Sequence, residues 1–241
     1  MRDFPKEVPQ WATHNYLLST VSTITPEEFN EIKTYNTESE HQVGRYLNWK
    51  AIVEEISFRE LNGDVIEFGT YQGLGLLMLS QLVEHSTTSR KIIGIDSFEG
   101  LPESSNHWIQ GQFGDTSSNQ VLEYFEQYFP KNINLSYDLI KGWFNEPHVA
   151  ETLYSICRNP VIIHFDADLG SSTLTALSIV EHYLSGRRDP IFFLFDDWGN
   201  SPLEIPVAWN TWLSTAKDKF NLSAEEISST VHTRNFRITF N

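Results

Sequence analysis

The chain has 241 residues, of which 40% are hydrophobic and 13% aromatic, a composition typical of a folded globular protein and not of a disordered one. Its 17 Lys and Arg residues against 32 Asp and Glu residues give a formal net charge of −15 at pH 7. That charge argues against nucleic acid or an anionic membrane as a partner, and it favours a hard cation with carboxylate ligands as the type of any bound metal.

The sequence shows no pattern typical of a secreted or membrane-spanning protein. The single cysteine, Cys157, has no partner for an intrachain disulfide, which fits a reducing compartment. Residues 1–10 carry charges and two prolines and lack the apolar core of a secretory signal. The longest strongly apolar run, Pro190–Phe195, is too short to span a membrane. We therefore expect a soluble, cytoplasmic protein.

The first 61 residues are predicted to form a helical extension. Thr25-Pro26-Glu27-Glu28 is typical of a helix start, with a Thr cap, Pro at the first position and acids in the first turn. A second helical pattern runs from about Gln42 to Ile56 and is ended by Asn62-Gly63. We interpret residues 1–61 as a lid over the active site or as a dimer contact, and residues 62–241 as the main domain.

Beyond residue 62, short apolar strands alternate with helices. This alternation predicts an α/β fold with a doubly wound, mostly parallel sheet covered by helices on both faces. The tail, Glu226–Phe240, is predicted to form an antiparallel hairpin that turns near Thr233. The predicted strands are Asp64–Phe68, Ile92–Ile95, Ile133–Ile140, Val161–Phe165 and Ile191–Phe195, and the predicted helices are residues 75–84, Asn119–Phe129, His148–Ile156, Ser172–Leu184 with Ser171 or Ser172 as its cap, and Val207–Phe220.

Acidic residues gather where the predicted strands end. In open α/β sheets, ligands bind beyond the carboxyl ends of the strands, and parallel strands bring those ends to one edge. The sequence therefore predicts a ligand site at this edge. The acids concerned are Glu67, Asp96, Asp166, Asp168, Asp196 and Asp197.

The first two strands indicate a nucleoside without phosphate. Gly69 and Gly73 allow a sharp turn, but their spacing is not that of a dinucleotide site, and no phosphate-loop Lys follows. Glu67 would repel a pyrophosphate and suit a cationic ligand. Asp96, at the end of the second strand, can accept both hydroxyls of a ribose. S-adenosylmethionine, which has a ribose, an amino acid and a sulfonium charge, fits this combination.

The later strands indicate a divalent cation. Asp166 ends one strand, and Asp196 and Asp197 end the next, so three carboxylates converge if these strands are neighbours. Carboxylates so close would repel one another, and Mg²⁺, which prefers carboxylates and waters, would relieve that repulsion. The alternative is a set of helix caps and turn acids. Asp168 either supports the ligands or caps the following helix.

Five motifs in chain order carry a family resemblance. The chain resembles the macrocin O-methyltransferase family over roughly Gly63–Trp198; these are class I, S-adenosylmethionine-dependent enzymes of natural-product tailoring. The resemblance implies the methyltransferase version of the doubly wound sheet, and O-methylation of a small molecule or sugar. The motifs are Glu67–Gly73, Gly94–Pro102, Lys141–Phe144, His164–Leu169 and Phe195–Trp198.

The resemblance also implies roles for individual residues. Asp96 would hold the ribose, with Ser97 and Phe98 beside the adenosine and Gly114-Asp115 near the adenine. Mg²⁺ on Asp166, Asp196 and Asp197 would chelate vicinal hydroxyls of the acceptor. The full set of cofactor residues so implied is Glu67, Phe68, Gly69, Thr70, Tyr71, Gly73, Asp96, Ser97, Phe98, Gly114 and Asp115.

Two departures from the family pattern concern the reaction. Related metal-dependent enzymes often place a Lys or His where this chain has Leu169, so Asp166 becomes the first candidate for the catalytic base and His164 the second. Gly170 stands where the family often has Tyr, which would open the acceptor pocket or shape the next helix. A metal-independent enzyme acting on nitrogen or a carboxylate, and an inactive nucleoside-binding protein, remain as alternatives.

Partners and aromatic residues complete the expectations. We expect a small hydroxylated acceptor, no nucleic acid, no membrane, and a homo-oligomer through the N-terminal helices as one use of the extension. Two aromatic groups could either contact ligands or pack in the core. The first comprises Trp108, Phe113, Trp143 and Phe144, and the second Trp209 and Trp212, which are three residues apart and share a helix face.

Overall fold

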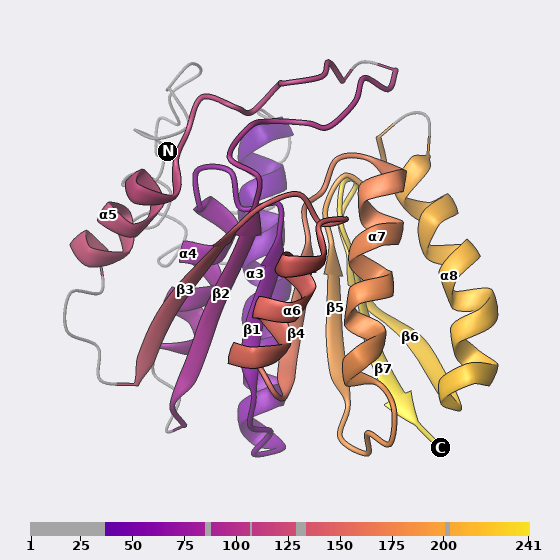
Figure 1. The fold of residues 1–241 in the computed structure, drawn as a ribbon. Coiled ribbons are helices and arrows are strands. Elements are labelled where there is room, and N and C mark those ends of the chain that lie inside the picture. Colours follow the sequence, from indigo (N-terminus) through magenta and orange to yellow (C-terminus); the bar gives the residue numbers. More distant parts are fainter. Residues whose placement is uncertain (1–36, 85–87, 107, 129–133, 201–202) are drawn as a thin grey trace.

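A computed structural model describes residues 37–84, 88–106, 108–128, 134–200 and 203–241 (Figure 1). The predicted helix start at Thr25-Pro26 and the rest of residues 1–36 lie outside the described residues.

The described strands form one seven-stranded sheet in the order β3-β2-β1-β4-β5-β7-β6. The first five strands are parallel, and β7 runs antiparallel to both β5 and β6. The predicted doubly wound sheet with its C-terminal antiparallel hairpin is thereby confirmed. The strands are β1 Asp64–Phe68, β2 Arg90–Asp96, β3 Leu135–Lys141, β4 Pro160–Phe165, β5 Ile191–Phe195, β6 Leu222–Ser229 and β7 Arg234–Phe240.

Helices cover both faces of the sheet, as the continuous burial of β4 and β5 requires (Figure 1). One core cluster joins α3, α4 and α5 to one face, and a second joins α6, α7 and α8 to the other. None of the described helices combines the length and hydrophobicity that a membrane span needs. The helices are α3 Thr37–Phe58, α4 Leu74–Val83, α5 Ser118–Tyr128, α6 Pro147–Ile156, α7 Gly170–Val180 and α8 Glu204–Phe220.

The bounds of α7 and α8 differ from those predicted. α7 begins at Gly170 without a serine cap, because the Glu204 carboxylate accepts the Gly170 N–H at 3.0 Å. It ends at Val180 and continues as a short 3₁₀ turn, Glu181–Tyr183. α8 begins three residues earlier than predicted, at Glu204, because Pro206 is tolerated in a first turn whose N–H groups need no helical partner.

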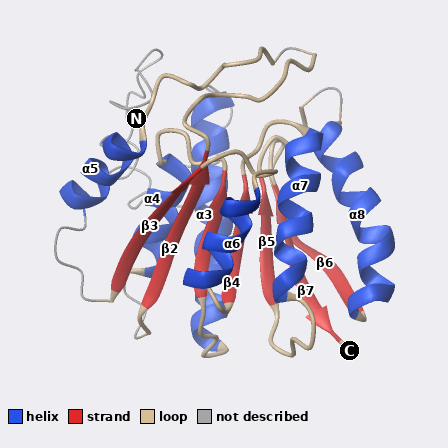
Figure 2. Cartoon of the chain, in the orientation of Figure 1, coloured by secondary structure: helices blue, strands red, loops and turns tan. Residues whose placement is uncertain are grey.

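The register of the parallel strands brings their carboxyl ends to one edge. Phe68 of β1 is paired with Ile95 of β2 on one side and Phe165 of β4 on the other, and Phe165 is paired with Phe195 of β5. Each strand therefore ends at the same level. Figure 2 shows the connecting loops gathered above that edge.

Helix α3 is anchored in the core. Its side chains Trp49, Ile52 and Ile56 are at most 3% exposed and belong to the cluster that also holds β1 and α4. Glu55 of the same helix forms an ion pair of 2.5 Å with Arg237 of β7. The described part of the N-terminal extension is thus built into the hydrophobic core.

Truncation of Ile56 tests this anchoring. Ile56→Ala should lower the free energy of unfolding by about 2–5 kcal/mol, because it removes buried methyl groups and leaves a cavity. Phe58→Ala is the matched control on the same helix: Phe58 is 89% exposed, and its loss should change stability by less than about 0.5 kcal/mol. Urea unfolding of both variants gives the comparison, and equal midpoints would show that α3 detaches from the core.

Candidate active site

A cavity of about 640 Å³ opens at the carboxyl edge of the sheet, walled by the loops that follow β1 to β5. This is where the strand-end acids predict a ligand. Eight of the predicted site residues line it: Gly69, Thr70, Tyr71, Asp96, Ser97, Asp166, Asp196 and Asp197. Those that do not line it are Glu67, Phe68, Gly73, Phe98, Gly114, Asp115 and His164.

The turn after β1 requires glycine at its first position. Gly69 has φ of +87°, and a Cβ built on it would overlap the carbonyl oxygen of Asp166. Its N–H donates to Ile95 of β2 at 2.9 Å, while the Asp166 N–H donates to Phe68 at 2.9 Å. The absence of a side chain therefore lets three strand ends close around the floor of the cavity.

Asp96 is held rigidly and still faces the cavity. Its Oδ2 accepts the Tyr71 N–H at 2.8 Å, and its Oδ1 accepts the Phe98 N–H at 2.6 Å. Burial raises the pKa of this carboxyl, and the backbone donors oppose that rise. Each carboxylate oxygen has a further lone pair, so Asp96 can accept hydroxyl donors from a ligand without losing the bonds that orient it.

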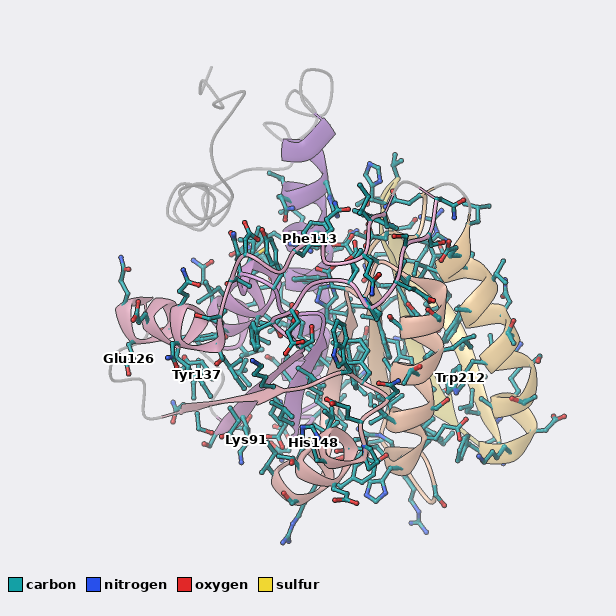
Figure 3. The ribbon with its side chains drawn as sticks, turned by 45° about the horizontal axis from the view of Figure 1, so that its top comes forward. Lys91, Phe113, Glu126, Tyr137, His148 and Trp212 are labelled. Atoms are coloured by element: carbon teal, nitrogen blue, oxygen red, sulfur yellow. The ribbon has the colours of Figure 1, made fainter. Side chains whose placement is uncertain are left out.

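Aromatic rings form one wall of the cavity. The Tyr71 ring lies 5.1 Å from Phe113, which in turn lies 5.5 Å from Trp108. Figure 3 labels Phe113 on the loop that crosses this edge of the sheet. The Tyr71 hydroxyl donates to Asp115 at 2.8 Å, so Asp115 supports this wall although it does not line the cavity.

The structure places the two groups of aromatic residues, whose roles the sequence left undecided, in different surroundings. Trp108, Phe113, Trp143 and Phe144 all line the cavity. Trp209 and Trp212 are at most 5% exposed and pack on Phe193 of β5. Trp212 of α8, labelled in Figure 3, also donates its indole N–H to Glu181 at 3.0 Å. The second pair is therefore part of the core.

Glu67 and His164 form a buried pair behind the cavity wall. They are 1% and 0% exposed, and His164 Nδ1 lies 2.9 Å from Glu67 Oε1. Burial, with the nearby Arg45 charge, lowers the pKa of His164 to about 3, and burial raises that of Glu67 well above its usual value. Both residues therefore favour uncharged forms. The prediction of His164 as a base for the acceptor does not fit this position.

The acid that ends β5 is neutralised from helix α3. Asp196 Oδ2 accepts a hydrogen bond from Arg45 Nη1 at 2.6 Å, and Oδ1 lies 2.6 Å from His41 Nε2. Because a carboxylate only accepts, this His41 nitrogen carries the proton. Burial alone would raise the pKa of Asp196, but His41 and Arg45 outweigh it and hold that pKa well below its usual range.

The acids Asp166, Asp168 and Asp197 are compensated less completely than Asp196, and their pKa values are raised. Burial and repulsion from Asp196 raise the pKa of Asp166, although Arg45 opposes this. Burial and mutual repulsion likewise raise the pKa values of Asp168 and Asp197, whose side chains are hydrogen-bonded to each other. Two carboxyls so close favour a shared proton.

The predicted Mg²⁺ ligands already have protein partners. Arg45 contacts both Asp166 and Asp196, and Asp197 accepts from Asn200 at 2.5 Å. Mg²⁺ needs oxygens at about 2.1 Å in octahedral geometry, so it would have to take the place of the guanidinium. Across the described ranges, one potential ligand set lies within 4.8 Å, and it is Glu67, His164 and Asp166. Its first two members bond each other behind the cavity wall. The residues as they stand do not fit the predicted ion.

Sequence reasoning missed the contribution of α3. His41 and Arg45 are four residues apart and so share a helix face, and Gln42 adds a bond to Arg45 of 2.6 Å. Arg45 falls within the apolar run that buries Val43, a position where an unpaired cation is costly. That conflict was the available signal that a buried acid faces this helix.

Gly170 does not open the cavity. It lies outside the cavity lining, and a Cβ at this position would meet Glu204 Cβ at 3.1 Å. The same glutamate contacts Ser105 Oγ and accepts from Asn106 at 2.7 Å. The first turn of α8 therefore fills the space beside Gly170.

The sheet order, the strand-edge cavity and the C-terminal antiparallel hairpin define the class I methyltransferase fold. The sequence profile of macrocin O-methyltransferase matches residues 41–216, which is more than half of the chain. The chain therefore belongs to the macrocin O-methyltransferase family.

Individual relatives are similar to the chain at low sequence identity. The chain is 26% identical over 172 residues to demethyldecarbamoylnovobiocin O-methyltransferase of Streptomyces niveus, covering 65% of this chain and 63% of that protein. It is 27% identical over 165 residues to 8-demethyl-8-(2,3-dimethoxy-alpha-L-rhamnosyl)-tetracenomycin-C 4'-O-methyltransferase of Streptomyces olivaceus, covering 64% and 60%. The chain thus spans less than two thirds of the length of either relative.

Solved structures agree on the fold. The structure of the O-methyltransferase NovP superposes with a TM-score of 0.62 at 18% identity, over 81% of this chain and 79% of NovP.

Two glycines test the floor of the cavity. Gly69→Ala should lower the free energy of unfolding by more than about 4 kcal/mol, because the new methyl group overlaps the Asp166 backbone. Gly111→Ala is the control: Gly111 has a similar φ of +81° with nothing within 4 Å of its Cβ position, and only the left-handed strain of about 1–2 kcal/mol should remain. Urea unfolding compares the two variants. Equal losses of stability would mean that the positive φ alone, and not the overlap with Asp166, accounts for the effect of Gly69→Ala.

Proposed function

We propose that this protein transfers the methyl group of S-adenosylmethionine to a hydroxyl oxygen of a small molecule, of the natural-product or sugar class. The observation that carries the proposal is Asp96, a carboxylate fixed by two backbone donors and facing the cavity beside the Gly69 turn. Membership of the macrocin O-methyltransferase family supports the same assignment.

The cofactor would lie above β1 and β2. Asp96 would accept the two ribose hydroxyls, and the backbone from Gly69 to Tyr71 would lie along the methionine part. The rings of Tyr71, Phe113 and Trp108 offer flat apolar surface for the adenine. Asp96 would repel a pyrophosphate, so a nucleoside fits better than a dinucleotide.

The acceptor would lie above β4 and β5. Neutral polar side chains line this half of the cavity, from Ser171, Ser172 and Thr175 of α7 and from Asn200 after β5. Hydroxyl and amide groups both donate and accept, which suits a ring bearing several hydroxyls. The names of both curated relatives describe O-methylation of natural products, and one of them names a rhamnosyl group.

Asp166 is the proposed base. Its side chain is 28% exposed at the cavity, and burial raises its pKa, which makes it a better proton acceptor. As the acceptor oxygen attacks the methyl carbon, the C–O bond forms and the C–S bond breaks. The hydroxyl proton passes to Asp166, and S-adenosylhomocysteine leaves. Most of the acceleration would come from holding oxygen, carbon and sulfur in line.

Cofactor binding is the first test. S-adenosylhomocysteine should bind the purified protein, and Asp96→Ala should weaken it by roughly 100-fold, because two hydrogen bonds to a charged acceptor are lost. Asp138→Ala is the control: this acid on β3 is 44% exposed and pairs with Lys91 away from the cavity. Calorimetric titration measures all three proteins.

The outcomes separate the alternatives. Absence of binding to the unmodified protein would contradict the proposed function. Binding that survives Asp96→Ala unchanged would place the nucleoside elsewhere in the cavity. An inactive nucleoside-binding protein would bind S-adenosylhomocysteine but would leave S-adenosylmethionine intact with every hydroxylated acceptor offered.

The charge of the cavity predicts which acceptors are used. Uncharged or amine-bearing glycosides should be methylated at least about tenfold faster than the same sugars linked to a nucleoside diphosphate, since the acids repel phosphate. Methyl transfer from labelled cofactor measures this ratio, and a preference for the phosphorylated acceptor would be the contrary result. The acids of the lining are Asp96, Glu103, Asp166, Asp168, Asp196 and Asp197, against the cation Arg45 and two histidines, His41 and His232.

A further inference from the structure

We propose that Arg45 takes the place of the divalent cation in this chain. Its guanidinium compensates the charge of the strand-end acids, and the reaction proceeds without a metal. The inference rests on the proposed function only in that it concerns the same cavity. It departs from the metal dependence that the sequence motifs imply.

The position of Arg45 is that of a bridging cation. Its Nη1 atom lies 2.6 Å from Asp196 Oδ2 and 3.3 Å from Asp166 Oδ2, so one nitrogen contacts the acids that end β5 and β4. A metal ligated by these two carboxylates would need this same space. Compensation of the two carboxylate charges by Arg45 and compensation by a metal ion therefore exclude each other.

Arg45 is fixed and cannot easily withdraw. Its side chain is 3% exposed, its Nη2 donates to Gln42 at 2.6 Å, and its guanidinium lies 5.0 Å from the centre of the Trp49 ring. Trp49 is itself in the core cluster. Displacing the guanidinium would leave a buried charge without its partners, which is strongly unfavourable.

His41 completes the saturation of Asp196. It occupies Oδ1, which also accepts the Asp197 N–H at 3.1 Å. Both oxygens of Asp196 therefore have donors, and the residue is 3% exposed. Oδ1 therefore has two donors and Oδ2 has one, and the lone pair that remains on Oδ2 belongs to the oxygen against which the Arg45 guanidinium lies.

Replacement of a metal ion by Arg45 changes how the acceptor would be bound. A metal ion can bind two neighbouring hydroxyls at once, whereas a guanidinium already engaged with two carboxylates cannot. Arg45 instead holds Asp166 in place for the proton, and the acceptor would be bound by neutral groups such as Ser172 and Asn200. An isolated hydroxyl should therefore serve as well as a vicinal pair.

Manganese binding tests the proposal without any acceptor. Free Mn²⁺, followed by electron paramagnetic resonance, should bind the unmodified protein with a Kd above about 1 mM, because Arg45 already lies between Asp166 and Asp196. Arg45→Met removes the charge and nearly keeps the volume, and it should tighten Mn²⁺ binding by at least about tenfold. Lys50→Met, which removes a charge at an exposed position of the same helix, should leave Mn²⁺ binding unchanged.

Two results would overturn the proposal. One is stoichiometric Mn²⁺ binding to the unmodified protein that is lost in Asp196→Asn; this measurement does not depend on the folding of the Arg45 variant. The other is an Arg45→Met protein that unfolds cooperatively in urea yet gains no affinity for Mn²⁺. Titration with S-adenosylhomocysteine on the same samples distinguishes this proposal from the proposed function. Cofactor binding can persist, and so support the proposed function, even when the Mn²⁺ measurements contradict the role of Arg45.

Discussion

The contact between Arg45 and the acids that end β4 and β5 organises the rest of the cavity. A parallel sheet brings its carboxyl ends together, and in this chain those ends carry acids, so the edge gathers like charges. One guanidinium offsets part of that repulsion and fixes Asp166 and Asp196 in place. It comes from α3, a helix anchored in the core by Trp49 and Ile56, so the electrostatics of the cavity and the stability of the fold share one element.

The sequence predicted the centre of the sheet well because β1, β4 and β5 are buried on both faces. An uninterrupted apolar run such as Ile191–Phe195 admits few alternatives when turn residues flank it and helices separate it from the next run. The start of α7 was predicted less well. Its first N–H is satisfied by Glu204, 34 residues away, and a cap that arrives through tertiary structure leaves no local pattern.

Acids that look equivalent in the sequence have different positions in the structure. Glu67 lies within β1, one residue before its end, and its side chain passes under Gly75 of α4 to meet His164. Asp96 is the last residue of β2 and reaches the cavity. One position along a strand reverses the side-chain direction, so proximity to a strand end alone could not separate them. Arg45, one of the two side-chain partners of Asp196, lies 151 residues earlier in the chain, so no local motif could predict that contact.

The close approach of α7 and α8 has an evolutionary consequence. Glu204 fills the space beside Gly170, bonds its N–H and also contacts Ser105 and Asn106 of the loop after β2. A bulky side chain at position 170 would displace that carboxylate and release both contacts. Positions 170 and 204 should therefore change together among homologous sequences: a glycine at the first should accompany an acid at the second, and a tyrosine should accompany a differently placed α8.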